Sequence, residues 1–372
     1  MRVLHLASHL NVGGITTYIL SLSEALQRRG HRIVIASGGG GLEAQAQALG
    51  VTHWTAPLHT SAEFSLQVFR AGGRIAQRLR QEPVDLIHAH TRVGQVVAAR
   101  LSSSLKVPYV TTWHGFFRRN LGRRLWPCTG SRTIAISEPV RRHLINEFHV
   151  PESRVRLVVN GVDPSHFAEP PAASALQEFR ERWRIAAGAL VIGAIGRMAS
   201  GRVKGFDLLL DAVHLLERDF PQLHVVMVGD GPRRPFIHEK IDRFDLGDRV
   251  HLTGAAADVR IPLALMDVFV FPVRWNEGFG LSLIEAMAAG KPVVASRTGA
   301  VPDIVEHGRS GWLVDAEDSQ ALAEGIARLL RDRAEAQRMA AAARQRVQER
   351  FSLEQMTDRV EMVYLEAVKS GK

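Results

Sequence analysis

Two glutamates, Glu277 and Glu285, flank a Gly-Phe-Gly turn that leads into a helix-forming run ending at Gly290. The free backbone N–H groups and the positive dipole end of a helix start suit an anion, above all a phosphate. Gly278 and Gly280 let the backbone approach that anion closely. Two carboxylates beside a phosphate would repel it unless they accept hydrogen bonds from hydroxyl groups. The spacing therefore predicts a ligand with a sugar on each side of a diphosphate.

Two cationic side chains stand at loop positions in the second half of the chain. Arg197 follows a strand expected over 190–195, and Lys204 precedes a helix expected over 206–218. At such positions an arginine can bind a diphosphate through two N–H groups, and a lysine can bind it as a point charge. Arg202 lies between the two and competes for the role of Arg197. The second half is therefore predicted to bind the diphosphate through cations as well as through backbone amides.

The first half opens with a strand, a turn, a helix and a second strand, which is typical of a doubly wound α/β sheet. Gly13 and Gly14 lie at the turn, where such a sheet exposes its ligand crevice. The turn lacks G-x-G-x-x-G, which argues against a dinucleotide site. His114 follows a strand expected over 106–113, at the carboxyl end where the functional side chains of open sheets lie.

A pair of histidines, His88 and His90, stands at the end of another expected strand. Residues two apart on a strand face the same way, so this pair could hold a metal. The sequence indicates no third ligand, and we expect a polar strand end instead. No Asp-x-Asp stands at an evident strand end to hold a metal against a diphosphate. The sequence thus predicts no metal site.

The run E-G-F-G-L-x-x-x-E-A-M-A-x-G-x-P-V-V-A-S, from Glu277 to Ser296, resembles the signature of the retaining, nucleotide-sugar-dependent glycosyltransferases of family GT4. The resemblance implies the GT-B architecture, an α/β fold of two Rossmann-like, doubly wound domains that face each other across a cleft. It implies an acceptor-binding domain at 1–168 and a nucleotide-sugar-binding domain at 169–352. A final helix, about 353–372, is then expected to pack back onto the first domain.

The resemblance also implies roles for the site residues. Arg197 and Lys204 would bind the leaving diphosphate, and His114 would reach toward the donor sugar or the reacting centre. Glu285 would accept hydrogen bonds from the ribose, and Glu277 from the transferred sugar. The residues expected to act in catalysis are Glu277, Arg197, Lys204 and His114. Those expected to bind the donor are Gly13, Gly14, Gly278, Phe279, Gly280, Leu281 and Glu285.

The net charge of +9 belongs to the first half: residues 1–165 carry 20 Lys and Arg against 9 Asp and Glu, whereas the rest carries 27 against 29. A basic half suits an anionic partner such as a membrane surface or a lipid diphosphate. No nucleic-acid recognition module is visible.

In Phe116–Trp126 four arginines alternate with aromatic and aliphatic residues, which favours contact with an anionic membrane surface. A solvated acceptor loop would look similar.

A single cysteine, Cys128, excludes an internal disulfide framework and agrees with a reducing compartment. The first residues read directly into a strand, without the pattern of a signal peptide. No run approaches the roughly 18 to 20 apolar residues that a membrane-spanning helix needs. We expect a cytoplasmic protein, peripheral at the inner face of a membrane.

These features predict retaining transfer of a sugar from a nucleoside diphosphate to a hydroxyl of a glycan or lipid-linked acceptor, in the synthesis of cell-envelope polysaccharide or glycolipid. The resemblance implies UDP as the favoured carrier, because it is the commonest in that family, with GDP as a competitor, and no cofactor beyond the donor is expected. Glu277 as a covalent nucleophile is a less favoured route. The alternatives are a sugar-nucleotide 2-epimerase and a non-catalytic sugar-nucleotide-binding protein. A nicotinamide-dependent dehydrogenase is disfavoured because both first turns lack its fingerprint.

Overall fold

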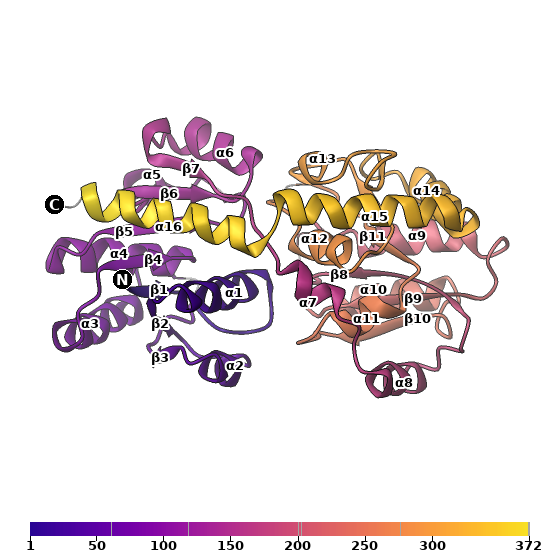
Figure 1. Cartoon of the computed structure of the whole chain (residues 1–372), viewed down its shortest axis with the longest axis horizontal. Helices are drawn as coiled ribbons and strands as arrows, with labels where there is room; N and C mark the ends of the chain where they lie inside the picture. The colour runs from indigo at the N-terminus through magenta and orange to yellow at the C-terminus, as the bar shows by residue number, and fades with distance from the viewer. Residues whose placement is uncertain (61, 118, 200, 202, 276, 371–372) are drawn as a thin grey trace. The chain divides into compact units, whose positions relative to one another are not determined.

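The computed structural model describes residues 1–60, 62–117, 119–199, 201, 203–275 and 277–370. The chain divides into two compact units (Figure 1). The first unit comprises Met1–Asn160 together with the C-terminal helix α16 (Leu353–Ser370), and the second comprises Gly161–Ser352.

The first unit is built on a seven-stranded parallel sheet in the order β3-β2-β1-β4-β5-β6-β7. The strands are β1 (Arg2–Leu6), β2 (Arg32–Ser37), β3 (Thr52–Thr55), β4 (Leu86–Ala89), β5 (Tyr109–Trp113), β6 (Arg132–Ala135) and β7 (Val155–Leu157). The helices are α1 (Gly14–Arg28), α2 (Glu43–Ala48), α3 (Leu66–Gln81), α4 (Arg92–Leu105), α5 (Leu121–Leu125), α6 (Glu138–Phe148) and α16, with a short 3₁₀ turn at Glu152–Arg154.

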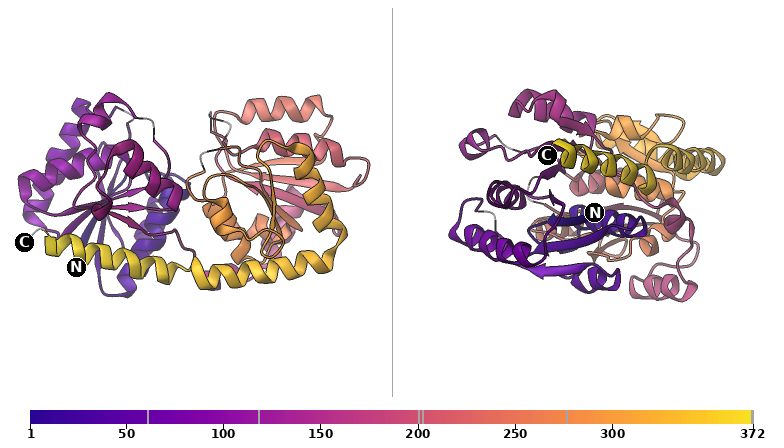
Figure 2. Two further views of the ribbon diagram at one scale, coloured as in Figure 1. Left: turned by 90° about the horizontal axis from the view of Figure 1, so that it is seen from above. Right: turned by 60° about the vertical axis from the view of Figure 1, so that its left-hand side comes forward.

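Helices cover both faces of this sheet (Figure 2). One apolar core joins α1 and α16 to one face, and a second joins α3 and α4 to the other. The central strands β4 and β5 are accordingly buried except for the first residue of β5, which is typical of parallel sheets. Ion pairs fix α16 at its polar edge: Glu361 binds Arg29 and His31, and Glu366 binds Arg132 and Arg156.

The second unit is built on a six-stranded parallel sheet in the order β10-β9-β8-β11-β12-β13. The strands are β8 (Leu190–Ile195), β9 (Leu223–Val228), β10 (Val250–Gly254), β11 (Val268–Phe271), β12 (Val293–Ser296) and β13 (Trp312–Val314). The helices are α7 (Pro164–Ala168), α8 (Ala173–Arg182), α9 (Phe206–Leu216), α10 (Arg234–Arg243), α11 (Arg260–Leu265), α12 (Leu281–Ala288), α13 (Val301–Ile304), α14 (Ser319–Arg331) and α15 (Arg333–Arg350). The predicted α/β class, with two doubly wound sheets, is confirmed.

The division between the units falls at Asn160–Gly161, before the domain boundary expected at residue 168. The reason is α7, which packs against α12 and α15 of the second unit. The backbone of Val162 also donates to Phe351 O at 3.0 Å. The segment that follows the N-G-V-D turn therefore belongs to the second unit by its contacts.

In both sheets the chain reverses its direction of winding at one place, between β1 and β4 and between β8 and β11. Ligands of open α/β sheets bind outside the carboxyl ends of the strands at such a switch point. Residues that follow β1 and β4 in the first unit, and β8 and β11 in the second, are therefore placed for function.

Gly205 adopts a left-handed conformation (φ +62°) at the start of α9, and a Cβ there would lie 1.7 Å from Pro272 O. An alanine at this position would have to keep a left-handed backbone conformation and displace the backbone carbonyl of Pro272. We therefore expect Gly205→Ala to lower the free energy of unfolding by more than about 2 kcal/mol. Urea denaturation measures this change. Gly247→Ala is the matched control, since a Cβ at Gly247 meets nothing within 4 Å. Equal unfolding midpoints for the two variants would contradict the packing argument.

Candidate active site

The loops that follow β8 and β11 bring a lysine and a glutamate together. Lys204 Nζ donates to Glu277 Oε2 at 2.5 Å, and both side chains are largely buried. The two residues are 73 positions apart in sequence, so the pair is a product of the sheet topology. A cation and a carboxylate therefore meet at the switch point of the second unit.

Several glycines make room for this pair. The methylene groups of Lys204 run past Gly196, where a Cβ would come within 3.3 Å of them. The ammonium lies 5.4 Å from the centre of the Phe271 ring, a cation–π contact. Gly299 leaves space for the backbone of Glu277, since a Cβ there would lie 2.4 Å from Glu277 O. Gly196 and Gly299, which the sequence analysis did not single out, thus allow the close packing of this pair.

The start of α12 follows Glu277 directly. Gly280 is its N-cap, with φ +115° and no side-chain cap. The first amides of a helix have no intrahelical partner, so those of Gly280 and Leu281 are suited to an anion. Ser282 Oγ donates to Ile195 O at 2.9 Å and so fixes this helix start to the end of β8. Gly278 and Phe279 complete the turn, and the Phe279 ring is buried.

Glu285 lies on α12 and is only 7% exposed. Burial raises the pKa of its carboxyl group to about 7. A carboxyl group whose pKa is raised by desolvation is typical of functional sites, because a binding partner can replace the lost water.

The buried carboxyl of Glu285 predicts a pH-dependent effect on stability. Its pKa is near 4.5 when unfolded and about 7 when folded, so the native state holds more protons between these values. The stability contributed by this group therefore falls as pH rises from 4.5 to 7 and stays low above 7. We expect Glu285→Gln to raise the unfolding free energy at pH 8 by on the order of 3 kcal/mol and to change it little at pH 4.5. Urea unfolding at the two pH values measures this, and an equal effect at both would contradict it.

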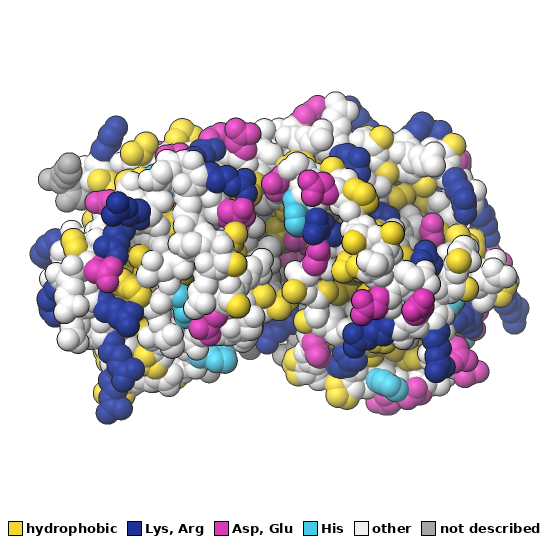
Figure 3. Space-filling view, turned by 60° about the horizontal axis from the view of Figure 1, so that its bottom comes forward, with side chains coloured by type: hydrophobic (Ala, Val, Ile, Leu, Met, Phe, Trp, Pro, Cys, Tyr) yellow, Lys and Arg dark blue, Asp and Glu magenta, His cyan; other side chains and the backbone are white. Residues whose placement is uncertain are grey.

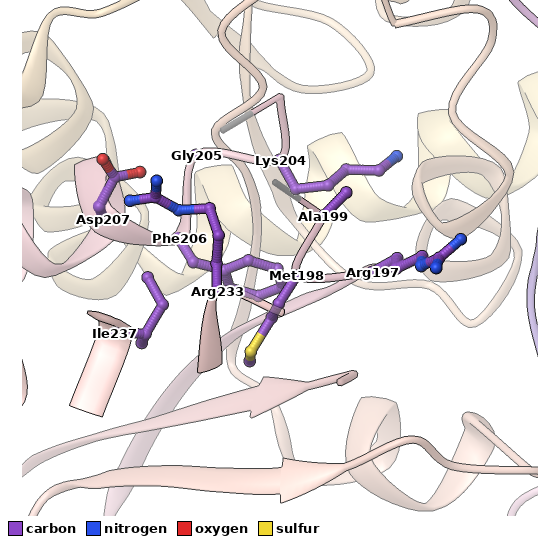
Figure 4. A pocket seen from close by; sticks show the side chains of 9 residues that line it. All are labelled: Arg197, Met198, Ala199, Lys204, Gly205, Phe206, Asp207, Arg233 and Ile237. Carbon is purple, nitrogen blue, oxygen red and sulfur yellow. The ribbon is translucent and has the colours of Figure 1, made fainter. Parts of the chain in front are cut away.

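Arg197 follows β8 and is exposed. Figure 4 shows its side chain extending in the same direction as that of Lys204, away from Asp207. The pocket drawn there is lined by Arg197, Met198, Ala199, Lys204, Gly205, Phe206, Asp207, Arg233 and Ile237. The positions predicted for Arg197 and Lys204 at a strand end and a helix start are confirmed. Arg202, the competing arginine, lies outside the described residues.

Sequence reasoning missed Arg233, a third cation in the same pocket. One of its guanidinium nitrogens, Nη2, is buried without a hydrogen-bond partner among the described residues. The ring of Phe236 stacks 4.0 Å from the guanidinium carbon. Its position just after Gly231-Pro232, at the end of a strand, was the signal that could have identified it.

The remaining predicted residues belong to the first unit. Gly13 and Gly14 are exposed at the turn between β1 and α1, and a Cβ at Gly13 would meet nothing within 4 Å. His114 follows β5 directly, at a carboxyl strand end. Burial lowers the pKa of His114 to about 3, so its ring is neutral at physiological pH. Tyr18 of α1 stacks on it edge to face, with ring centres 4.9 Å apart.

A third histidine, His5, does stand beside His88 and His90, so the expectation that this pair has no third ligand was wrong. His5 of β1 pairs in register with His88 of β4, and the three rings lie close enough to share a metal ion. However, both ring nitrogens of His88 bond to hydroxyls, those of Tyr364 and Thr112, each at 2.7 Å. Both nitrogens of His90 bond to other histidines. The cluster is therefore built as a hydrogen-bond network, and it fits a metal poorly.

Comparison with known proteins identifies both halves of the chain. A family model described as glycosyl transferases group 1 matches residues 176–346, and one described as glycosyltransferase family 4 matches residues 12–166. N-acetyl-alpha-D-glucosaminyl L-malate synthase of Bacillus anthracis is 24% identical over 97% of this chain and 96% of that enzyme. A GDP-mannose-dependent alpha-(1-6)-phosphatidylinositol monomannoside mannosyltransferase of Mycobacterium tuberculosis is 32% identical over 61% of this chain and 59% of that enzyme.

Solved structures share the fold over nearly the whole chain. Anabaena Alr3699/HepE, in complex with UDP and glucose, superposes with a TM-score of 0.86 at 23% identity, covering 98% of this chain and all of that one. WaaG, a glycosyltransferase involved in lipopolysaccharide biosynthesis, gives 0.74 at 14% identity, covering 96% and 98%. The two matched families together span most of the sequence, and both sheets have the expected doubly wound form. The chain therefore belongs to the family 4 glycosyltransferases with the GT-B fold.

Proposed function

We propose that this enzyme is a retaining glycosyltransferase that uses a nucleoside diphosphate sugar, UDP-sugar in the first instance, and a hydroxyl acceptor. The observation that carries the proposal is the contact of Lys204 Nζ with Glu277 Oε2 beside the uncapped start of α12. A cation, a carboxylate and free amides side by side suit a sugar joined to a diphosphate. The carboxylate then meets sugar hydroxyls, and the cation and amides meet phosphate oxygens.

In the proposed reaction the bond between the anomeric carbon and the diphosphate oxygen breaks, and the acceptor oxygen bonds to that carbon on the same face. The acceptor's proton passes to a diphosphate oxygen. Negative charge grows on the departing diphosphate, where fixed donors stabilise it most effectively. Arg197, Lys204 and the amides of Gly280 and Leu281 supply these donors. Together they provide the positive charge that a divalent metal supplies in other transferases.

The nucleotide is tested by thermal shift with UDP, GDP, ADP and CMP, followed by incubation with mass-tagged sugar nucleotides. UDP is favoured because the fold neighbour Alr3699/HepE is solved with UDP. GDP is the competitor, because a mannosyltransferase relative is GDP-mannose-dependent. We expect the melting temperature to rise most with UDP. Transfer to an acceptor with retained anomeric configuration supports the proposal. Interconversion of the sugar nucleotide, or binding without turnover, would replace it by an epimerase or a sensor.

The acceptor is proposed to be lipid-linked or an envelope glycan, reached at an anionic membrane surface. Leu121, Leu125 and Trp126 of the α5 region are 64–75% exposed, and Phe64 contacts Trp126 with ring centres 6.2 Å apart. Leu121, Leu125 and Trp126, together with the exposed Arg124, are called the α5 patch. Figure 3 shows a row of Lys and Arg side chains on the first unit and others spread over the second. Among the described helices, none combines the length and apolar composition needed to span a bilayer.

The α5 patch predicts preferential binding to anionic vesicles. Co-sedimentation with phosphatidylglycerol vesicles should exceed that with phosphatidylcholine vesicles and should weaken as salt is added. Leu125→Ser with Trp126→Ser should lower the bound fraction several-fold, since two exposed apolar side chains are lost. Leu215→Ser is the matched control, because Leu215 is 55% exposed on α9 of the second unit. Equal binding to both kinds of vesicle would remove the membrane from the proposal. Arg118, within the segment predicted to contact the membrane, lies outside the described residues.

A further inference from the structure

Three histidines of the first unit form a continuous chain that ends at His114. His5 lies on β1, His90 follows β4 and His114 follows β5, and these strands are neighbours in the sheet. Side chains two residues apart on a strand, and those paired across neighbouring strands, share one face. Helices α1 and α16 cover that face. The three rings are therefore aligned from the interior of the unit toward the carboxyl edge of its sheet.

The rings are joined by direct hydrogen bonds. His5 Nδ1 and His90 Nε2 are 2.8 Å apart, and His90 Nδ1 and His114 Nε2 are 3.3 Å apart. Burial lowers the pKa of all three rings, so each is neutral and carries a single proton. A neutral imidazole donates from one nitrogen and accepts at the other. Once the protonated nitrogen of one ring is known, the two hydrogen bonds determine which nitrogen is protonated in the other two rings.

Two proton orders satisfy both hydrogen bonds. In the outward order each ring carries its proton on Nδ1, His5 donates to His90, and His90 donates to His114. In the inward order each ring carries its proton on Nε2, and the donors run from His114 to His5. The two orders leave different groups at the two ends of the row of histidines, and the inner end distinguishes between them.

The inner end favours the outward order. His5 Nε2 is buried and has no hydrogen-bond partner among the residues that the structure describes. In the inward order it would carry a buried, unpaired N–H, a group that is rarer in native proteins than an unpaired acceptor. In the outward order it is an unprotonated nitrogen. The outer end does not decide, because His114 is partly exposed and its Nδ1 can pair with solvent or ligand in either order.

We propose that His5 and His90 are positioning residues that hold the His114 proton on Nδ1, so that the enzyme presents a neutral hydrogen-bond donor at the carboxyl end of β5. His114 then donates to an oxygen of the bound substrate and does not act as a general base. The role at the substrate rests on the proposed glycosyl transfer. The proton order itself is a property of the free enzyme.

The test is nitrogen-15 NMR of the full chain labelled at histidine, without substrate. Signals are assigned by the single changes His5→Asn, His90→Asn and His114→Asn, and the exposed His59 serves as a reference ring. We expect His5, His90 and His114 all to be protonated at Nδ1, the minor form of free histidine. Protonation of His114 at Nε2 would overturn the proposal, whether or not the enzyme transfers sugar. Stoichiometric zinc that shifts the His5, His88 and His90 signals would also overturn it, in favour of a metal site.

Substitutions at His5 separate positioning from packing. His5→Leu removes the inner donor, so His114 should lose its fixed Nδ1 proton, and kcat should fall at least about 10-fold with little change in the KM of the donor. His5→Asn keeps an N–H group near the place of Nδ1, and it should rescue both the His114 signal and most of the lost turnover. Melting temperatures of the two variants report their folding. If the variants lose turnover equally while both keep the His114 proton on Nδ1, the histidine chain has only a structural role.

Discussion

Lys204→Ala is expected to lower turnover by about 100- to 1,000-fold, the range found when one fixed donor to a developing oxyanion is removed. Lys204 Nζ lies 2.5 Å from Glu277 Oε2, the carboxylate proposed to bind the sugar. Its loss should act mainly on kcat, because the charge on the diphosphate grows as the glycosidic bond breaks. Binding of the free nucleoside diphosphate should weaken as well. Steady-state kinetics and thermal shift with UDP measure the two effects.

Arg338→Ala is the control for this loss of charge, because Arg338 is an exposed cation on α15. It changes the net charge by the same amount and should leave turnover unchanged. Lys204→Arg keeps the charge but not the compact ammonium, and it should recover only part of the activity. Wild-type turnover in Lys204→Ala would remove this residue from the mechanism.

Glu277→Gln is expected to lower turnover by about 10- to 100-fold, the range that corresponds to one lost hydrogen bond to a charged group. The amide keeps the shape of the side chain but loses the negative charge that strengthens hydrogen bonds accepted from sugar hydroxyls. It also frees Lys204, which no longer has a carboxylate partner at 2.5 Å. UDP without a sugar should therefore bind at least as tightly as it does to the wild type. The sugar nucleotide should bind less tightly, because it loses the hydrogen bonds between its sugar and Glu277.

An opposite response of the two ligands would identify Glu277 as a residue that contacts the sugar. Glu178→Gln on α8 is the control, since Glu178 is exposed in the same unit. Equal weakening of UDP and UDP-sugar would mean that the glutamate only supports the loop. Trapping of a glycosylated Glu277 would replace the same-face mechanism by a covalent one.

Local pattern predicted the fold and the place of the candidate site. The glycines around Glu277 and the helix-forming run to Gly290 predicted a helix start, and α12 begins at Leu281 with Gly280 left-handed before it. Arg197 and Lys204 lie at the strand end and helix start expected for them. These features depend on neighbouring residues, whose spacing is visible in sequence. Their roles in binding and transfer stay predictions.

Contacts between distant residues could not be predicted in the same way. Lys204 and Glu277 meet through the pairing of β8 with β11, and His5 joins His90 across 85 positions. Each contact depends on which strands are neighbours and in what register, and neither follows from a local period. Arg233 was missed because the Gly231-Pro232 turn before it does not reveal that its side chain reaches the pocket lined by Arg197 and Lys204. His5 was missed as a neighbour of His88 and His90 for the same reason, since it lies on another strand.

The last helix has a consequence for synthesis of the protein. Helix α16 contributes Met356, Val360 and Tyr364 to the core that it shares with α1, yet it follows the whole second unit in the chain. While the ribosome is still making the second unit, one face of the first sheet lacks this cover and exposes apolar surface. The earlier half of the enzyme can thus be completed only after the later half has emerged, so nascent chains depend on the final residues to escape aggregation.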